Sequence, residues 1–219
     1  MNTIRLAALL LIAGAPLAAQ TPTPATPAAL QTLAGAYYAW RDSSNPVSSS
    51  DQGLHTWDDR LTDYTMAAVL ARRRHVTGLL ARVGAMRTDA WARDDRVDWM
   101  LFRAQLEGVA FFDRVMQNEA TNPQVYVGEC GNAIFSLLKK DYASQATRAR
   151  AALARLRAMP ALLTQGRRNL IRPVRLYAEL AIDAARSGDD LFTRSLMTLA
   201  DSLSDAERGH GVLTVSAGN

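Results

Sequence analysis

The residues whose types and spacing best suit chemistry lie in the stretch GLHTWDDRLTDYT, residues 53–65, just ahead of a long apolar-periodic run. It brings His55, Trp57, Asp58 and Asp59 within five positions. A histidine beside carboxylates is a combination that active sites use, so these side chains could line a substrate channel. The alternative is structural: an aspartate in such a loop can bind backbone amides or an arginine and so brace the loop.

The rest of the sequence supplies no complete catalytic motif. His55, His75 and His210 are far apart, whereas a zinc-hydrolase helix carries two histidines four positions apart with a glutamate beside the first. The sequence has no Gly-x-Ser-x-Gly elbow, phosphate loop or glycine-rich dinucleotide fingerprint. Cys130, the single cysteine, sits among small residues and is expected to be a buried, inert thiol. We therefore predict no catalytic residue and no metal ligand in this chain.

Helical periodicity dominates the chain after residue 30 and predicts the elements that must position this stretch. The pattern gives helices over residues 30–42, 66–83, 93–117, 129–139, 145–159, from 160, 174–187 and from 189 onward. Thr65 and Ser144 are the expected N-caps, Pro160 and Pro173 the expected first-turn residues, and residues 43–53 an expected flexible loop. Because no alternating β-branched segment of any length occurs, we expect an all-α fold, an irregular multi-helix bundle over residues 31–208.

The predicted helix over residues 93–117 carries more apolar surface than one buried stripe needs. The stripe expected to face the core consists of Val97, Met100, Leu101, Ala104, Val109 and Phe112. Trp99, Phe102 and Phe111, together with Phe112, extend the apolar surface beyond that stripe. We therefore expect an exposed aromatic patch and self-association of the isolated chain.

The two ends of the chain read as segments outside the helical domain. Residues 1–19 have one early cation, Arg5, then a short apolar core and small residues, which is typical of a cleaved secretory signal peptide. Residues 20–30 form a Pro/Thr-rich flexible linker, and residues 209–219 an irregular tail. We expect a periplasmic or extracellular protein without stable membrane insertion after signal cleavage.

The charge composition of the chain limits the classes of partner that it is expected to bind. The chain holds 25 Lys+Arg against 21 Asp+Glu, a small and scattered surplus that does not indicate nucleic acid binding. The one tight basic cluster, ARRRH at residues 71–75, lies inside a helical pattern and is expected to be a solvated helix face. With a single cysteine, the exported chain must be stabilised by its core rather than by disulfides within the chain.

Four stretches together carry a family likeness: GLHTWDDRLTDYT, DDRVDWMLFRAQLE, GECGNAIFSLLKKDYA and RARAALARLRAMPALLTQGRRNL, in this order. Over roughly residues 31–205 the chain resembles the N-terminal half of the bacterial domain of unknown function 885 family. The resemblance implies exported or cytosolic helical zinc peptidases of carboxypeptidase type. Their zinc helix, of His-Glu-x-x-x-Gly-His type, and a further acidic ligand lie in the C-terminal half, so no zinc ligand is carried over to this sequence.

The resemblance makes His55, Trp57, Asp58 and Asp59 a family landmark that could line the substrate channel of a whole enzyme. The function expected is therefore an exported helical N-terminal portion of a metallopeptidase-like protein, with a truncation or frame change after Arg208. Such a chain would be inactive alone and would meet a peptide substrate only with the C-terminal half supplied. The alternative is a free-standing extracytoplasmic helical binding or scaffold protein.

Overall fold

The computed structural model describes residues 25–201, so the expected signal peptide, residues 20–24 of the linker and the tail lie outside the described residues. Within residues 25–201 the chain is helical, with no strand, which confirms the all-α prediction. No helix in this part of the chain is long and apolar enough to cross a membrane.

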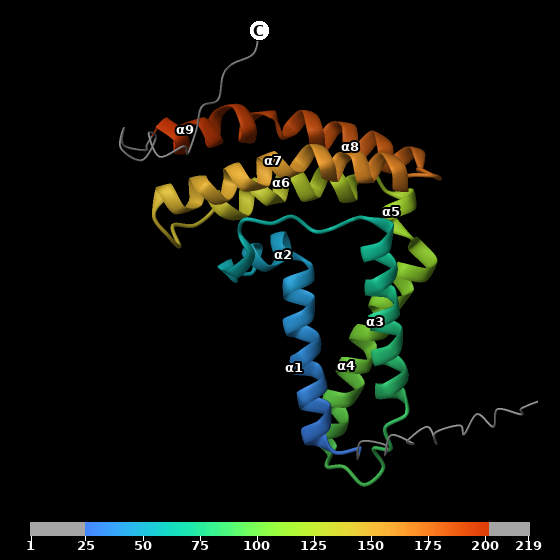
Figure 1. Cartoon of the computed structure of the whole chain (residues 1–219). Helices are drawn as coiled ribbons and strands as arrows, with labels where there is room; N and C mark the ends of the chain where they lie inside the picture. The colour runs from blue at the N-terminus through green and yellow to red at the C-terminus, as the bar shows by residue number, and fades with distance from the viewer. Residues whose placement is uncertain (1–24, 202–219) are drawn as a thin grey trace, which may run out of the picture.

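The helices form two groups. Three long helices run side by side and are called here the three-helix leg: α1 (Pro27–Ser44), α3 (Met66–Gly84) and α4 (Arg93–Phe111). Four helices lie across one end of the leg and are called the crossing layer: α6 (Gln124–Leu138), α7 (Gln145–Asn169), α8 (Arg175–Ser187) and α9 (Leu196–Asp201) (Figure 1). Short elements join them: α2 (Pro46–Asp51), the 3₁₀ turn η1 (His55–Trp57), the π-helical turns η2 (Phe112–Met116) and η3 (Leu191–Ser195), and α5 (Asn118–Thr121).

Each group has its own apolar core. The leg buries Leu30, Leu33, Tyr37, Val76, Leu79, Val83, Phe102 and Leu106. The crossing layer buries a second set, mainly from α6 and α7, which includes Ile134, Leu137, Met159 and Leu162. Val47 of α2 belongs to this second core, so α2 joins the leg to the crossing layer.

Capping residues start several helices where the sequence indicates. The Thr65 hydroxyl accepts from the Ala68 amide at 3.3 Å, and Ser144 accepts from the Thr147 amide at 3.2 Å, which confirms both predicted N-caps. Thr26 does the same for α1, accepting from Ala29. Helix α1 therefore begins at Pro27, and residues 27–30 belong to it rather than to the expected linker.

The expected flexible loop over residues 43–53 is wrong for its central part. Residues 46–51 form α2, in which Ser49 and Ser50 are each only 1% exposed. Pro46 occupies the first turn, where its missing N–H is not needed. The Ser49 hydroxyl donates to the Asp42 carbonyl at 2.7 Å and so ties α2 to the end of α1. Turn-forming residue types here make a buried corner instead of a mobile segment.

Pro160 does not begin a new helix. It lies inside α7, which continues unbroken from Gln145 to Asn169. A proline removes one backbone hydrogen bond, but Pro160 is exposed while Met159 and Leu162 are buried, so packing holds the helix together. Pro173 stands one residue ahead of the Val174 N-cap and so lies outside α8, which makes its expected first-turn position wrong, whereas Gly188 ends that helix as expected.

The inward stripe predicted for residues 93–117 is wrong except at Val109, which packs against the core of the leg. Val97, Met100, Leu101 and Phe112 are 39, 54, 64 and 54% exposed. The face of α4 that packs on α1 and α3 carries Phe102 and Leu106 instead. Both faces are apolar, so the period alone could not say which one the leg would cover. The expected exposed aromatics are present at Phe111 and Phe112, whereas Phe102 is buried.

Candidate functional site

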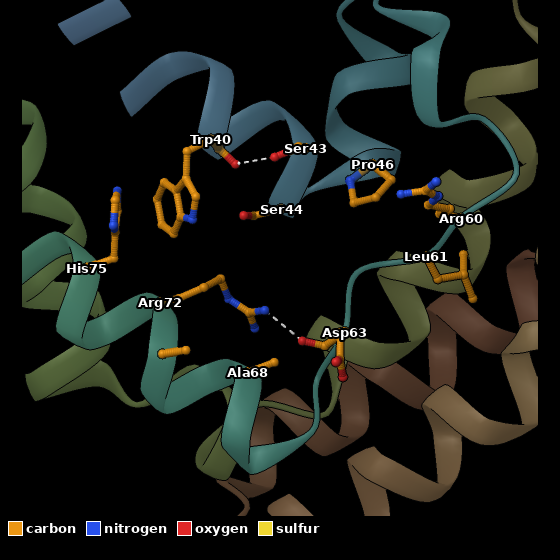
Figure 2. Close-up of a pocket in the computed structure, with 11 residues that line it drawn as sticks. Trp40, Ser43, Ser44, Pro46, Arg60, Leu61, Asp63, Ala68, Arg72 and His75 are labelled. Carbon is orange, nitrogen blue, oxygen red and sulfur yellow. Dashed lines mark hydrogen bonds between the residues drawn. The ribbon is translucent and has the colours of Figure 1, made fainter. Parts of the chain in front are cut away.

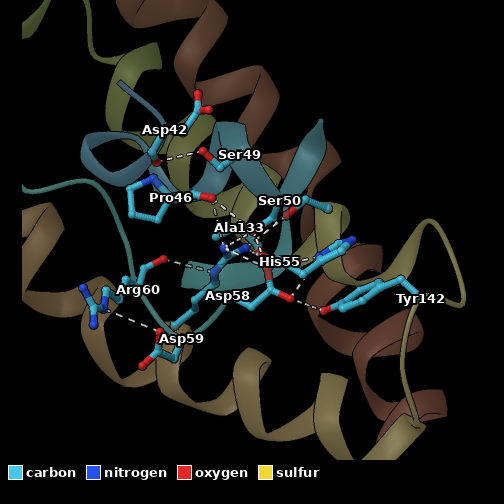
Figure 3. Close-up of polar contacts among 12 residues, drawn as sticks. Asp42, Pro46, Ser49, Ser50, His55, Asp58, Asp59, Arg60, Ala133 and Tyr142 are labelled. Carbon is cyan, nitrogen blue, oxygen red and sulfur yellow. Dashed lines mark hydrogen bonds and ion pairs between the residues drawn. The ribbon is translucent and has the colours of Figure 1, made fainter. Parts of the chain in front are cut away.

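The stretch 53–65 lies where the leg meets the crossing layer, and it has two sides. On one side, Arg60, Leu61 and Asp63 help to line an open cavity between α1 and α3 (Figure 2). On the other side, Asp58 enters a network of polar contacts with α2 and the crossing layer (Figure 3). The polar contacts on this second side show which roles His55 and Asp58 have in the structure.

Asp58 is the centre of this network. One of its oxygens accepts the Ser50 hydroxyl at 2.5 Å, and the other accepts the Tyr142 hydroxyl. His55 Nδ1 lies 3.0 Å from the second oxygen, and the His55 ring stacks on Tyr142 with centroids 3.3 Å apart. Burial, helped by the bond to Asp58, raises the pKa of the Tyr142 hydroxyl, so it remains a donor. An acceptor-only carboxylate is thus satisfied by three donors.

Arg155 of α7 anchors the network from the crossing layer. Its side chain is fully buried. Its five N–H groups meet five acceptors: the carbonyls of Arg60, Ala133 and Pro46 and the hydroxyls of Ser136 and Ser50, at 2.6 to 3.5 Å. Burial lowers the pKa of Arg155 and the nearby Asp58 raises it, and a guanidinium stays charged in either case.

The Arg155 and Asp58 charges meet through Ser50. Nη2 of Arg155 lies 3.9 Å from Asp58 Oδ1, and it donates to the Ser50 oxygen at 2.6 Å. One guanidinium therefore ties α7 to α2, to the loop at Arg60 and to α6. Side chains that are fully engaged in this way hold a loop in one shape.

The four predicted channel residues are therefore not brought together as one surface. His55 and Asp58 belong to the network, and Asp59 points away, 64% exposed, with Arg60 Nε at 3.6 Å. Trp57 is half-buried in the 3₁₀ turn. None of the four lines the cavity of Figure 2. For Asp58 the geometry matches the loop-brace interpretation.

The sequence interpretation missed Arg155, although a signal for it exists. The buried residues of α7 are Arg148, Ala151, Ala152, Arg155, Met159, Leu162 and Gly166, at spacings of three and four, beside Ala146, Ala149 and Asn169. Arg155 stands in the middle of that stripe. Alanines give a weak apolar pattern, and an arginine is normally assigned to the surface, so the periodicity alone does not indicate that Arg155 is buried.

The cavity beside the loop has a volume of about 520 Å³. It is lined by Trp40, Ser43, Ser44, Pro46, Arg60, Leu61, Asp63, Ala68, Ala71, Arg72 and His75. Trp40 and His75 lie with ring centroids 4.1 Å apart, and Arg72 donates to the Asp63 carbonyl at 2.6 Å. Two guanidinium groups against one carboxylate give the lining a positive balance that suits an anionic group. Three residues of the ARRRH cluster, Ala71, Arg72 and His75, thus line a cavity rather than face only solvent.

The remaining reactive residue types do not form a centre within residues 25–201. No group of three or more His, Cys, Asp and Glu side chains in this part of the chain is placed to hold a metal ion. The described residues therefore do not fit a zinc site, and His210 lies outside them. Burial raises the pKa of the Cys130 thiol to about 11, which matches an inert thiol.

Comparison with known proteins places the fold. No curated protein matches the chain. A solved structure, described as a putative lipoprotein of unknown function from Shewanella oneidensis, is similar with a TM-score of 0.70 at 20% identity. The likeness covers 82% of this chain and 33% of that one, so the chain spans about a third of the length of the protein it matches. The family described as bacterial protein of unknown function (DUF885) matches residues 46–211, and the chain belongs to this family.

Proposed function

We propose that this chain is an exported, helical N-terminal portion of a metallopeptidase-like protein of carboxypeptidase type, and that it is inactive alone. Its role is to build one wall of the substrate channel. The observation that carries this proposal is the Arg155 network, which engages the Asp58 side chain and the Arg60 carbonyl of the landmark loop, residues 53–65, in bonds within the chain. A carboxylate satisfied by three donors is a support and not a free base.

The length of this chain, compared with that of the similar solved protein, supports the proposal that the chain is one portion of a larger protein. The chain spans a third of the solved lipoprotein it matches, so the shared helical fold is one portion of that molecule. A lipoprotein is an exported protein, and this favours a periplasmic or extracellular location for the present chain, in keeping with the signal-like residues 1–19.

The cavity beside the loop gives this portion a way to contribute to substrate binding. Arg60 and Leu61 come from the landmark loop, and Arg72 and His75 come from α3. Because Arg155 holds the Arg60 carbonyl at 3.1 Å, the buried network fixes the backbone of the cavity wall. The landmark would then act through the positions it imposes on its neighbours rather than through its own carboxylates.

The test uses the mature chain, purified from Gln20 onward. We expect no release of amino acids from peptides and no zinc site of defined stoichiometry in calorimetry. One tight zinc site that is abolished in His55→Ala, or peptide hydrolysis by the chain alone, would overturn the proposal. The nucleotide sequence downstream of Asn219 is a second test, because a zinc helix encoded there in another frame would support it.

The alternative, a free-standing helical binding or scaffold protein, is favoured by one observation. Each of the five N–H groups of Arg155 has an acceptor within residues 25–201, so this buried guanidinium needs no partner from another part of a larger protein. A sharp cooperative melt of a monomer that binds no hydrophobic dye, together with a terminator directly downstream, would select this alternative over the peptidase portion.

A further inference from the structure

Helix α4 has two apolar faces, and the described chain covers only one. The inner face, which includes Phe102 and Leu106, packs in the core of the leg. The outer face is exposed and consists of Val97, Met100, Leu101, Ala104, Gly108 and Phe111, at spacings of three and four. A helix that is apolar on opposite faces is normally buried on both. A contiguous exposed apolar face marks an interaction surface.

The middle of this outer face is shaped for a second helix. Ala104 and Gly108 are small and stand between the larger Met100 and Leu101 on one side and Phe111 on the other. A Cβ atom added at Gly108 would meet nothing within 4 Å in its own chain. Small residues at a contact let two helix axes approach closely, with the flanking large side chains packing on either side.

The charged side chains along the two edges of the outer face indicate which kind of helix can bind there. One edge carries Arg96 and Arg103 of α4 and Arg114 of the following turn η2, and Arg103 is paired to Glu107 at 2.7 Å. The opposite edge carries Asp94 and Asp98, both exposed. A partner must therefore present acidic residues on one edge and basic residues on the other. Helix α4, continued by the turn η2, itself has this arrangement.

The symmetry of the pair then decides whether the two α4 helices run parallel or antiparallel. When two identical helices are related by a two-fold axis parallel to them, the basic edge of one faces the acidic edge of the other. An antiparallel pair would set basic edge against basic edge and is disfavoured. We propose that the outer face of α4 binds the same face of a second copy of this chain, with the two α4 helices parallel. This inference does not rest on the proposed function.

The expected affinity of the dimer follows from the surface area that the interface can bury. A stable interface buries about 800 Å² on each partner, and a single helix face offers less. The dimer should therefore be reversible, with a dissociation constant on the order of micromolar. Concentration-dependent mass measurement by sedimentation or light scattering is the appropriate method.

Two variants and one control test the surface. Leu101→Glu places a charge on a 64% exposed position and should weaken the dimer at least tenfold without changing the helical dichroism. Gly108→Leu should do the same by blocking close approach, since a Cβ atom at this position meets nothing within 4 Å in its own chain. The control is Leu176→Glu on α8, 58% exposed, which should leave the dimer unchanged.

Cysteine cross-linking tests the direction. Val97→Cys and Phe111→Cys, each alone, should form disulfide-linked dimers if the helices are parallel, because each position then faces its own copy. Native Cys130 is buried and should not compete. Cross-linking only when the two variants are mixed indicates antiparallel helices and overturns the proposal. A monomer at all concentrations, or equal loss of the dimer in Leu176→Glu, also overturns it.

Discussion

Replacing Arg155 with methionine should be among the most destabilising single changes in this chain. Methionine keeps an unbranched apolar side chain in the site but donates no hydrogen bond. The carbonyls of Arg60, Ala133 and Pro46 and two hydroxyls lose their common donor. Asp58, 12% exposed, keeps its charge without the buried cation near it.

The magnitude follows from this burial. Removing one partner of a buried charge pair costs about 3–5 kcal/mol. No reduction for solvent screening applies, because Arg155 is fully buried and Asp58 nearly so. Since a domain of this kind is stable by about 5–15 kcal/mol, the substitution should remove about a fifth or more of the free energy of unfolding.

Urea denaturation followed by far-UV dichroism is the assay, with the slope against urea checked for constancy between variants. The matched control is Arg157→Met, an exposed arginine on the same helix, which should change stability by less than about 0.5 kcal/mol. Asp58→Asn should couple to Arg155→Met, so that the double variant loses less than the sum of the single losses. A loss below about 1 kcal/mol for Arg155→Met, or strict additivity with Asp58→Asn, would refute the network as a structural anchor.

Three further outcomes can be checked with the same protein. Gly166→Ala should destabilise the fold by about 1–3 kcal/mol, because the new Cβ would lie 2.7 Å from the Tyr126 ring. Gly35→Ala, whose Cβ would meet nothing within 4 Å, should stabilise the fold by about 0.5–1 kcal/mol. Equal effects of the two substitutions in urea titrations would contradict this. Burial raises the pKa of the Asp113 carboxyl, so its ionisation costs stability as pH rises through the folded pKa. Asp113→Asn should therefore raise the melting temperature at pH 7 and leave it nearly unchanged at pH 3, and a larger gain at pH 3 would reverse the sign. The Cys130 pKa of about 11 predicts slow thiol labelling at pH 8 that accelerates only on unfolding; rapid labelling of the folded chain would count against an inert thiol.

Local signals carried most of the fold, because helix starts and periods depend on near neighbours. The Thr65 and Ser144 caps and the extents of α3 and α8 follow from residues within a few positions. Pro160 shows where local rules stop. Its effect on α7 depends on which side of the helix is packed, and tertiary contacts set that.

The site was less accessible to sequence reasoning because its partners are remote. The acceptors of Arg155 come from residues 46, 50, 60, 133 and 136, up to 109 positions away along the chain. No residue close to Asp58 in the sequence indicates which cationic side chain would lie beside it in the fold. The pattern could state that an aspartate in this loop needs donors, and only the fold could supply Ser50, Tyr142 and the Arg155 guanidinium.

The misplaced stripe of α4 has a physical meaning of its own. A hydrophobic period reports what a helix can bury, not which neighbour will cover it. The residues predicted to face inward, Met100 and Leu101 among them, do form a face, and the described chain leaves it open. Because apolar area exposed to water is unfavourable by roughly 25 cal/mol per Å², this face favours any association that covers it. The edge charges then act as the selector, since a partner with the wrong charge order would bury the same apolar area beside like charges.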